Sequence, residues 1–400
     1  MLLKRGSAGI VDDFSNLRCP NGRKNMDATN TSPQESTLSS TVAGLGGKPL
    51  LTSRLAQDIQ DQATALSRVL TQCYGDGLPS ILQAAELLKS GRRVLLTGIG
   101  ASLFASISLQ YCLWSRGIAV TLIEAAEVLH YCHAAYSDAI FIVVSRSGES
   151  IEVTRLLSIV KGRQPIIAVT NEPASTLARE ADITLHLNSP PDEMVAVQTY
   201  TGTLLTLYAL VSAMDNRLEQ FKEEVSTIIP ELPQWISGLL QKRDGWDSFL
   251  RIDSPVYLLA RGASYASASE GALLFNEIAK IPAVGMLTAS FRHGPVELVD
   301  STFRGLIFAP QGRTQTLNLA LAHDLARFGG KVRVIGPPKE DASTIDCCPV
   351  SAVPELLTPL VEIIPVQVAA LRMAELRDIP PGSFRYTPQV AVDEESFVRA

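Results

Sequence analysis

The chain has 400 residues, of which 46% are hydrophobic and 19% are charged, and its formal net charge is −6. These values describe a globular protein with large buried sheets, and the length predicts two or three structural units. The acidic balance and the lack of a basic block argue against a nucleic-acid-binding protein. The longest uninterrupted apolar stretches, such as 204–214, fall well short of a membrane span, and the N-terminus lacks the apolar region of a secretory signal.

The cysteines show neither C-x-x-C nor Cys/His spacing, so the sequence predicts no metal site. Their scattered positions are typical of reduced core or surface thiols rather than of a disulfide framework. We therefore expect a cytoplasmic protein with no bound cofactor. The six residues are Cys19, Cys73, Cys112, Cys132, Cys347 and Cys348.

The first 46 residues have the polar, aperiodic composition of a tail, and we expect 1–46 to be disordered. Helical patterning begins around Leu51, runs past Leu70, and resumes from Leu78 to Leu88. A series of apolar strands alternating with helices follows, and this order is typical of a parallel sheet covered on both faces. The expected strands are 93–98, 118–123, 139–144, 165–169 and 183–187, and a long helix then runs through Met214.

The pattern then begins again. The stretch 94–103 aligns with 256–265, so that an apolar strand is followed in both by glycine, alanine and serine. Self-similarity at this spacing indicates a duplicated domain rather than a solenoid. The second copy is expected to have strands near 255–260, 282–287, 304–309 and 331–336 and a closing helix over 355–377. The predicted units are domain 1 (47–215), a helical linker (216–249), domain 2 (250–385) and a C-terminal tail (386–400).

The turn at 145–150 follows the third strand and contains Ser145, Ser147 and Ser150. A helical pattern begins directly after it, so unpaired backbone N–H groups and the positive end of a helix dipole lie beside several hydroxyl groups. This arrangement suits a small phosphate monoester, although an ordinary serine-capped turn has the same pattern. The corresponding stretch of the second domain, 311–314, has lost the serines, so only the first domain should hold a phosphate strongly.

Two glutamates in the second domain, Glu270 and Glu277, are two helical turns apart and share one face of a mostly apolar helix. A partly buried carboxyl group has a raised pKa, which suits a general base. His293 follows in a Phe-Arg-His-Gly-Pro turn and could move a proton near neutral pH. Two structural alternatives remain open: Glu270 pairs with an arginine, and His293 only braces its loop.

Together these motifs, over roughly residues 50–390, resemble the double SIS (sugar isomerase) domain family. The chain is similar to the isomerase half of glucosamine-fructose-6-phosphate synthase and to stand-alone isomerases, deaminases and deglycases. The resemblance implies an α/β fold of two tandem SIS domains, each a flavodoxin-like αβα sandwich. It also implies a homodimer in which His293 opens the sugar ring in the partner's site, while Glu277 moves the proton between C1 and C2. The substrate-binding residues that we expect are Ser102, Ser145, Arg146, Ser147, Ser150, Ser264 and Glu270.

The chain departs from the synthase pattern at its lysines. Leu274 stands where the synthase has a lysine, Tyr200 stands where many relatives have one, and the segment 381–387 lacks the lysine that forms an imine with the ketose. We also expect no glutaminase half, because Met1 and Leu2 offer no N-terminal cysteine nucleophile. The leading hypothesis is therefore an isomerase, deaminase or deglycase that acts on an amino-sugar or fructosamine 6-phosphate. The alternatives are a simple aldose–ketose phosphosugar isomerase and a non-catalytic sugar-phosphate sensor.

Overall fold

The computed structural model describes residues 53–251, 253–337, 345–386, 390–391 and 393–394. The predicted N-terminal tail, the start of the first predicted helix and most of the predicted C-terminal tail lie outside the described residues.

The first lobe is built on a five-stranded sheet in which every neighbouring pair of strands is parallel, in the order β2-β1-β3-β4-β5. The strands are β1 (Val94–Gly98), β2 (Val120–Glu124), β3 (Ile140–Val144), β4 (Ile166–Thr170) and β5 (Ile183–His186). The three central strands β1, β3 and β4 are buried along their whole length, as expected from their continuous apolar runs. The helices are α1 (Arg54–Gln60), α2 (Gln62–Tyr74), α3 (Leu78–Leu88), α4 (Ala101–Trp114), α5 (Ala125–Glu127), α6 (Ile151–Val160), α7 (Thr176–Glu180) and α8 (Gln198–Met214).

The second lobe repeats this design with a parallel sheet in the order β10-β9-β8-β6-β7. Its strands are β6 (Val256–Ala260), β7 (Ala283–Leu287), β8 (Arg304–Phe308), β9 (Lys331–Gly336) and β10 (Asp346–Pro349). Its helices are α12 (Tyr265–Ala279), α13 (Thr288–Arg292), α14 (Gln315–Arg327) and α15 (Thr358–Leu376). The strand β10 was not predicted, because Asp-Cys-Cys-Pro is short and lacks the β-branched residues that mark a strand. The two parallel sheets confirm the predicted fold class.

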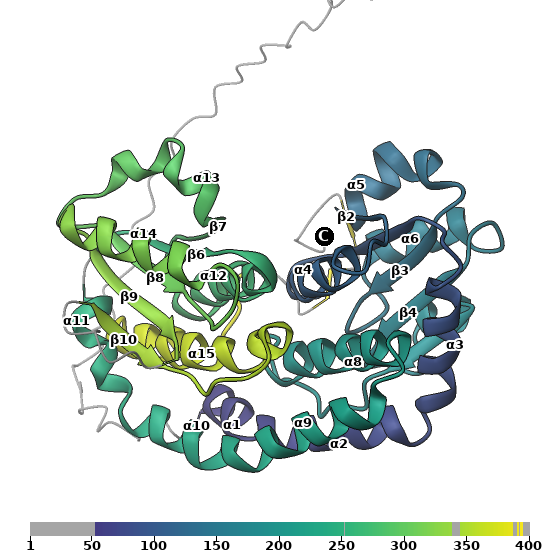
Figure 1. Ribbon diagram of the computed structural model, residues 1–400, viewed down its shortest axis with the longest axis horizontal. Coiled ribbons are helices and arrows are strands. Elements are labelled where there is room, and N and C mark those ends of the chain that lie inside the picture. The colour runs from purple at the N-terminus through teal and green to yellow at the C-terminus, as the bar shows by residue number, and fades with distance from the viewer. Residues whose placement is uncertain (1–52, 252, 338–344, 387–389, 392, 395–400) are drawn as a thin grey trace, which may run out of the picture. The chain divides into compact units, whose positions relative to one another are not determined.

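Helices connect the two sheets and fill the space between them (Figure 1). Helices α9 (Leu218–Ile228), α10 (Leu232–Gln241) and α11 (Asp247–Leu250) link the lobes. Helix α12 packs on α4 of the first lobe and on α15 of its own, and one cluster of buried apolar side chains includes residues of both lobes. The packing of α4 against α12 places the start of one repeat beside the start of the other.

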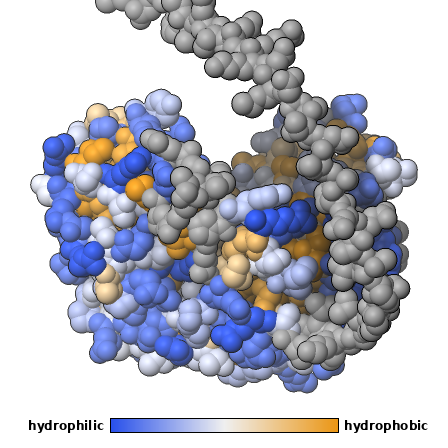
Figure 2. Space-filling view, turned by 180° about the vertical axis from the view of Figure 1, so that it is seen from behind, coloured by the Kyte–Doolittle hydropathy of each residue, from blue (hydrophilic) through white to orange (hydrophobic). Residues whose placement is uncertain are grey.

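Helix α15 lies at the centre of this core. The segment Glu355–Leu376 is the one stretch among the described residues that is long and apolar enough to cross a membrane, but 89% of its apolar window is buried inside the protein. Its length and apolarity are therefore explained by its position in the core. In Figure 2, polar side chains cover most of the face that is shown, and the apolar areas between them are smaller.

The contact between α12 and α15 allows a test with two glycines. A Cβ atom at Gly271 of α12 would lie 2.6 Å from Leu258 Cδ2 and 2.9 Å from Val366 Cγ1, whereas one at Gly238 of α10 would meet nothing within 4 Å. We expect Gly271→Ala to lower the free energy of unfolding by about 1–3 kcal/mol, because overpacking outweighs the gain in helix propensity. Gly238→Ala should raise it by up to about 1 kcal/mol. Chemical denaturation measures both, and equal effects would contradict the packing argument.

Candidate active site

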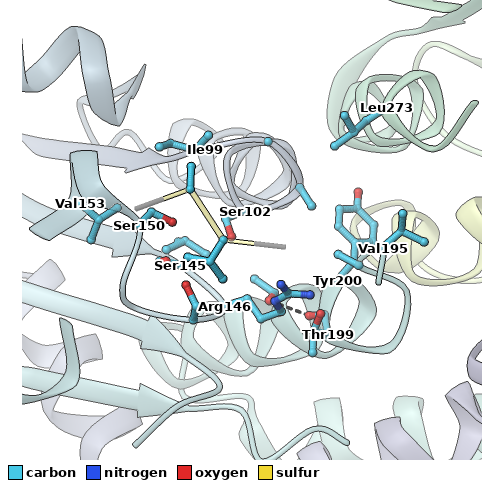
Figure 3. A pocket seen from close by; sticks show the side chains of 18 of the residues that line it. Ile99, Ser102, Ser145, Arg146, Ser150, Val153, Val195, Thr199, Tyr200 and Leu273 are labelled. Carbon is cyan, nitrogen blue, oxygen red and sulfur yellow. Dashed lines mark hydrogen bonds between the residues drawn. The ribbon is translucent and has the colours of Figure 1, made fainter. Parts of the chain in front are cut away.

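A cavity of about 260 Å³ lies where the carboxyl ends of β1 and β3 face helix α12 of the second lobe (Figure 3). Ligands in parallel α/β folds bind at this edge of the sheet. The first lobe contributes the turns after both strands, the segment before α8 and the first part of α8. The second lobe contributes Leu273 and Glu277, and the C-terminal segment contributes Phe384, Val390 and Ala391.

The serine turn after β3 lines one end of the cavity. The backbone at Gly148 is left-handed, with φ of 63°, and a Cβ there would lie 2.3 Å from Ser175 Oγ, so a larger residue does not fit. Ser145 Oγ accepts a hydrogen bond from the Gly148 N–H at 3.1 Å, and Ser147 Oγ accepts one from the Glu149 N–H at 3.3 Å. Both hydroxyl protons remain available, so the folded turn offers donors to an anion.

Ser150 precedes the first residue of α6, and its side chain makes no capping hydrogen bond. Its hydroxyl group therefore lies at the cavity edge as a donor beside the N-terminus of α6, although the first N–H of that helix, that of Ile151, donates to the Ala391 carbonyl at 3.2 Å. Ser102 lines the same cavity from the first turn of α4, directly after the left-handed Gly100. Two helix N-termini and four serines thus converge on one end of the cavity.

Arg146 supplies a positive charge at this end. Its carbonyl group accepts hydrogen bonds from the Asn171 N–H at 3.0 Å and the Thr170 hydroxyl at 3.1 Å, which fix the backbone. Within the described residues its side chain makes no hydrogen bond and no ion pair, so the guanidinium is free to bind an anion. Glu149 of the same turn points elsewhere, because its carboxylate accepts hydrogen bonds from Thr176 at the start of α7.

Glu277 approaches the cavity from the opposite lobe. Burial raises the pKa of its carboxyl group to about 7, and the positive charges of Lys280 and Arg146 act against this rise. The group is therefore about half ionised at neutral pH, which is the condition under which a carboxylate can both take up and release a proton.

Lys280 ends α12 in a left-handed conformation and connects Glu277 to the C-terminal segment. Its ammonium group donates hydrogen bonds to the carbonyl oxygens of Glu277 and Ser383, and it lies 5.8 Å from the centre of the Phe384 ring. Desolvation lowers its pKa below the ordinary value. Because Phe384 lines the cavity, Lys280 fixes part of the cavity wall as well as acting on Glu277.

The other predicted residues lie outside the cavity lining. Glu270 does not line the cavity and is completely buried, and neither carboxyl oxygen has a hydrogen-bond partner among the described residues. The predicted alternative, a pairing of Glu270 with an arginine, is wrong. His293 is exposed in the turn after α13 and does not line the cavity within this chain.

Ser264, the repeat partner of Ser102, is buried and donates a hydrogen bond of 3.0 Å to Glu362 of α15. Ser267 donates a second one of 2.8 Å to the same carboxyl group. At the second loop of the repeat, the Arg313 N–H donates to Glu355 at 3.4 Å. The second lobe thus fills its equivalent anion positions with carboxyl groups of its own.

Sequence reasoning missed several side chains that line the cavity. Tyr200 entered only as a departure from the lysine of relatives, and Phe384 only as part of a loop without lysine. Both line the cavity, as does Glu152 at the start of α6. No local pattern marks Tyr200 and Phe384, because each is brought in by an element distant in sequence from the serine turn, whereas Glu152 lies directly after that turn. Asp192 accepts hydrogen bonds from the Gln198 and Thr199 N–H groups and so orients the start of α8, which carries Tyr200.

The described cysteines, Cys73, Cys112, Cys132, Cys347 and Cys348, are free thiols. Within the same residues, no group of three or more His, Cys, Asp or Glu side chains is placed to hold a metal ion.

Comparison with solved structures shows which folds the chain resembles. It superimposes on the C-terminal domain of glucosamine-fructose-6-phosphate aminotransferase from Francisella tularensis with a TM-score of 0.74 and 21% identity, covering 82% of this chain and 97% of that one. It superimposes on glucosamine-6-phosphate deaminase from Thermotoga maritima with a TM-score of 0.67 and 21% identity, covering 85% and 99%. At these identities the likeness shows the fold.

Comparison of sequences shows the family. The chain is 27% identical over 335 residues to glutamine–fructose-6-phosphate aminotransferase (isomerizing) from Pyrococcus horikoshii, which covers 82% of this chain and 55% of the relative. It thus spans about half the length of the curated relatives that it matches. The SIS domain model matches residues 86–213 and 250–375, more than half of the chain. The chain therefore belongs to the SIS domain family.

Proposed function

We propose that the protein is an enzyme that acts on an amino-sugar or fructosamine 6-phosphate by moving a proton between C1 and C2. One observation carries the proposal: a carboxyl group with a pKa of about 7, that of Glu277, lines the same cavity as a cluster of anion-binding donors. The names of the relatives support it, since they include an isomerizing aminotransferase and a glucosamine-6-phosphate deaminase.

In the proposed complex, the phosphate binds at Ser102, Ser145, Arg146, Ser147 and Ser150, which line one end of the cavity. The helix N-termini of α4 and α6 add partial positive charge there. Anchoring the phosphate leaves the other end of the sugar to reach towards α12. Binding energy at the phosphate thus positions C1 and C2 near Glu277.

Both substrate types require Glu277 to move a proton between C1 and C2, but in opposite directions. With a 2-amino aldose, Glu277 removes the C2 proton and returns a proton to C1, which converts the amine into an imine at C2. Hydrolysis then gives the ketose phosphate and ammonia. With a fructosamine, Glu277 removes the C1 proton and returns one to C2, and hydrolysis of the resulting C1 imine gives the aldose phosphate and a free amine. The carboxyl group ends each cycle in its starting protonation state.

The lack of a lysine favours substrates that bring their own amine. No lysine lines the cavity in the described part of the chain, and the segment 381–391 contains none in its sequence. Lys280 donates its N–H groups to two backbone carbonyls and is not among the lining residues. An enzyme that had to form an imine with a plain ketose would need a free amine at this position.

We further propose a homodimer in which His293 of one protomer opens the sugar ring in the other protomer's site. The exposure of His293 and its distance from the lining of its own cavity support this arrangement. The free thiols support a reducing, cytoplasmic location.

The reaction can be tested with three substrates: glucosamine 6-phosphate, a fructosyl-amino-acid 6-phosphate and fructose 6-phosphate. We expect ammonia or free amino acid, together with hexose phosphate, from at least one of the amine-bearing compounds. Glu277→Gln should lower the rate by about 10²–10⁴-fold because it removes the proton-transfer group, while phosphosugar affinity is kept. Exchange of the C2 proton of fructose 6-phosphate alone would indicate a simple isomerase, and tight binding without any turnover would indicate a sensor.

The pH dependence of kcat/KM should report the ionisation of the Glu277 carboxyl group. The base must be ionised to accept a proton, so kcat/KM should rise with pH through about 7. Lys280→Met removes a positive charge that lowers the pKa of Glu277, and we expect it to move this limb upward by up to about one pH unit. Lys280→Arg keeps the charge and serves as the control. If the rise of kcat/KM occurred at the same pH in Lys280→Met as in the wild-type protein, a group other than Glu277 would control it.

The shared site can be tested by mixing two inactive variants. Glu277→Gln and His293→Asn should each be inactive with a ring-closed substrate, whereas a re-equilibrated equimolar mixture should recover about a quarter of the wild-type activity, because half of the sites in mixed dimers are intact. Assay of the mixture before and after subunit exchange measures this. If His293 acted within its own chain, no activity would return, and if it had no role, His293→Asn would be active by itself.

A further inference from the structure

Two buried polar side chains have no partners within the described residues: Tyr200 lines the cavity at the end opposite the serine turn, and Glu270 lies on α12 outside the lining. Tyr200 lines the cavity and is only 2% exposed, and its hydroxyl group makes no hydrogen bond within the described residues. Figure 3 shows this hydroxyl group pointing towards α12, the helix that carries Leu273. Glu270 lies on the same helix, completely buried, and both of its carboxyl oxygens are without partners among the described residues. Buried polar groups of native proteins nearly always have partners, so three such atoms together require an explanation.

Tyr200 and Glu270 interact electrostatically. Burial raises the pKa of Tyr200 well above its ordinary value, and the next largest cause is the charge of Glu270. Burial likewise raises the pKa of Glu270 well above its ordinary value, followed by the charges of Glu277 and Asp192. The two charges that act on Glu270 are thus both negative, and Lys280 and Arg146 act on Glu277 instead.

A positively charged donor would complete this cluster. A carboxylate in a buried setting is stable only when it is paired, and a phenol oxygen can accept a further hydrogen bond. An ammonium group carries one positive charge and three N–H donors, so it can donate to Tyr200 and Glu277 in the cavity lining while its charge acts on Glu270. A metal ion fits less well, because the described residues hold no group of three or more potential ligands placed for one. The cavity is therefore bipolar, with anion-binding donors at one end and unpaired acceptors at the other.

We propose that Tyr200 and Glu270 form an amine-recognition subsite, which selects phosphosugars that carry an ammonium group at C1 or C2 over those that carry a hydroxyl group there. This inference rests on the proposed function and deepens it. Tyr200 is the contact residue in the cavity wall, and Glu270 acts behind it as the charge that balances the ammonium group.

The proton balance of binding follows from burial. Burial raises the pKa of the Glu270 carboxyl group well above its ordinary value, so burial favours the form that carries its proton in the free protein. When the ammonium group of the ligand binds, the carboxyl group loses this proton to solvent and the two charges form a pair. An amine ligand should therefore release one more proton on binding than the matched hydroxyl ligand.

The test uses two open-chain ligands that cannot react because they have no carbonyl group: 2-amino-2-deoxyglucitol 6-phosphate and glucitol 6-phosphate. Calorimetric titration in two buffers of different ionisation enthalpy gives both affinity and proton release. We expect the wild-type protein to bind the amine ligand about ten- to a hundredfold more tightly, as one charged hydrogen-bonded pair predicts. Tyr200→Phe and Glu270→Gln should each reduce this preference, and Glu270→Gln should abolish the extra proton release.

The matched control is Tyr208→Phe. Tyr208 lies two turns later on α8 and is equally buried, but its hydroxyl group pairs with Ser108 and it does not line this cavity. Loss of that hydroxyl group should leave the preference unchanged, which separates recognition from a general effect of the helix on stability. Glucitol 6-phosphate should bind all the variants equally.

Two results would overturn the subsite alone: equal affinity of the wild-type protein for both ligands, or an unchanged preference in Tyr200→Phe and Glu270→Gln. Failure of both ligands to bind would overturn the proposed function together with the subsite. Loss of affinity for both ligands in the variants, with an unchanged ratio, would assign Tyr200 and Glu270 a structural role and so overturn the inference as well.

Discussion

The burial of helix α12 is the constraint on which both the fold and the cavity depend. This helix packs on α4 of the first lobe and on α15 of the second, and most of its side chains are buried. It nevertheless carries two carboxyl groups, and burying them without a paired cation is unfavourable unless they hold a proton. The same packing that joins the lobes therefore raises the pKa of Glu277 to about 7 and that of Glu270 well above its ordinary value. Stability and chemical reactivity are set by one contact between helices.

The two lobes share an architecture but differ in the groups at their equivalent turns. In the first lobe, the hydroxyl groups of the serine turn and the side chain of Arg146 are left for a ligand. In the second lobe, Ser264 and Ser267 donate to Glu362, and the loop at Arg313 donates to Glu355. A carboxyl group from the chain itself thus stands where the first lobe would accept an external anion. This difference gives a physical reason why a duplicated fold has one anion site, and it agrees with the loss of serines from the second turn.

The sequence predicted the fold well because a parallel sheet needs continuous apolar strands, and these are visible in any single segment. It missed β10, whose Asp-Cys-Cys-Pro sequence is held in the sheet by pairing with β9 rather than by its own propensity. The serine turn was visible for a related reason, since strand, turn and helix are adjacent in the chain. Tyr200 and Phe384 could not be found in this way, because the residues that give them a role belong to other elements. The role of Ser264 could not be predicted either, because its hydrogen-bond partner Glu362 lies on α15, far away in the chain.

Charge distribution links the missing lysines to the choice of substrate. Among the described residues the cavity is lined by one arginine and by no lysine, whereas Glu277 lines it from α12 and Glu152 lines it beside the serine turn. A neutral sugar phosphate would satisfy the arginine end and leave the acidic end without a cation. An amino-sugar phosphate carries both charges on one molecule, at opposite ends of a six-carbon chain. The proposed function gives Leu274 and Tyr200 a common reason: at the positions where the family resemblance led us to expect lysines, the ammonium group of the proposed substrate would supply the positive charge.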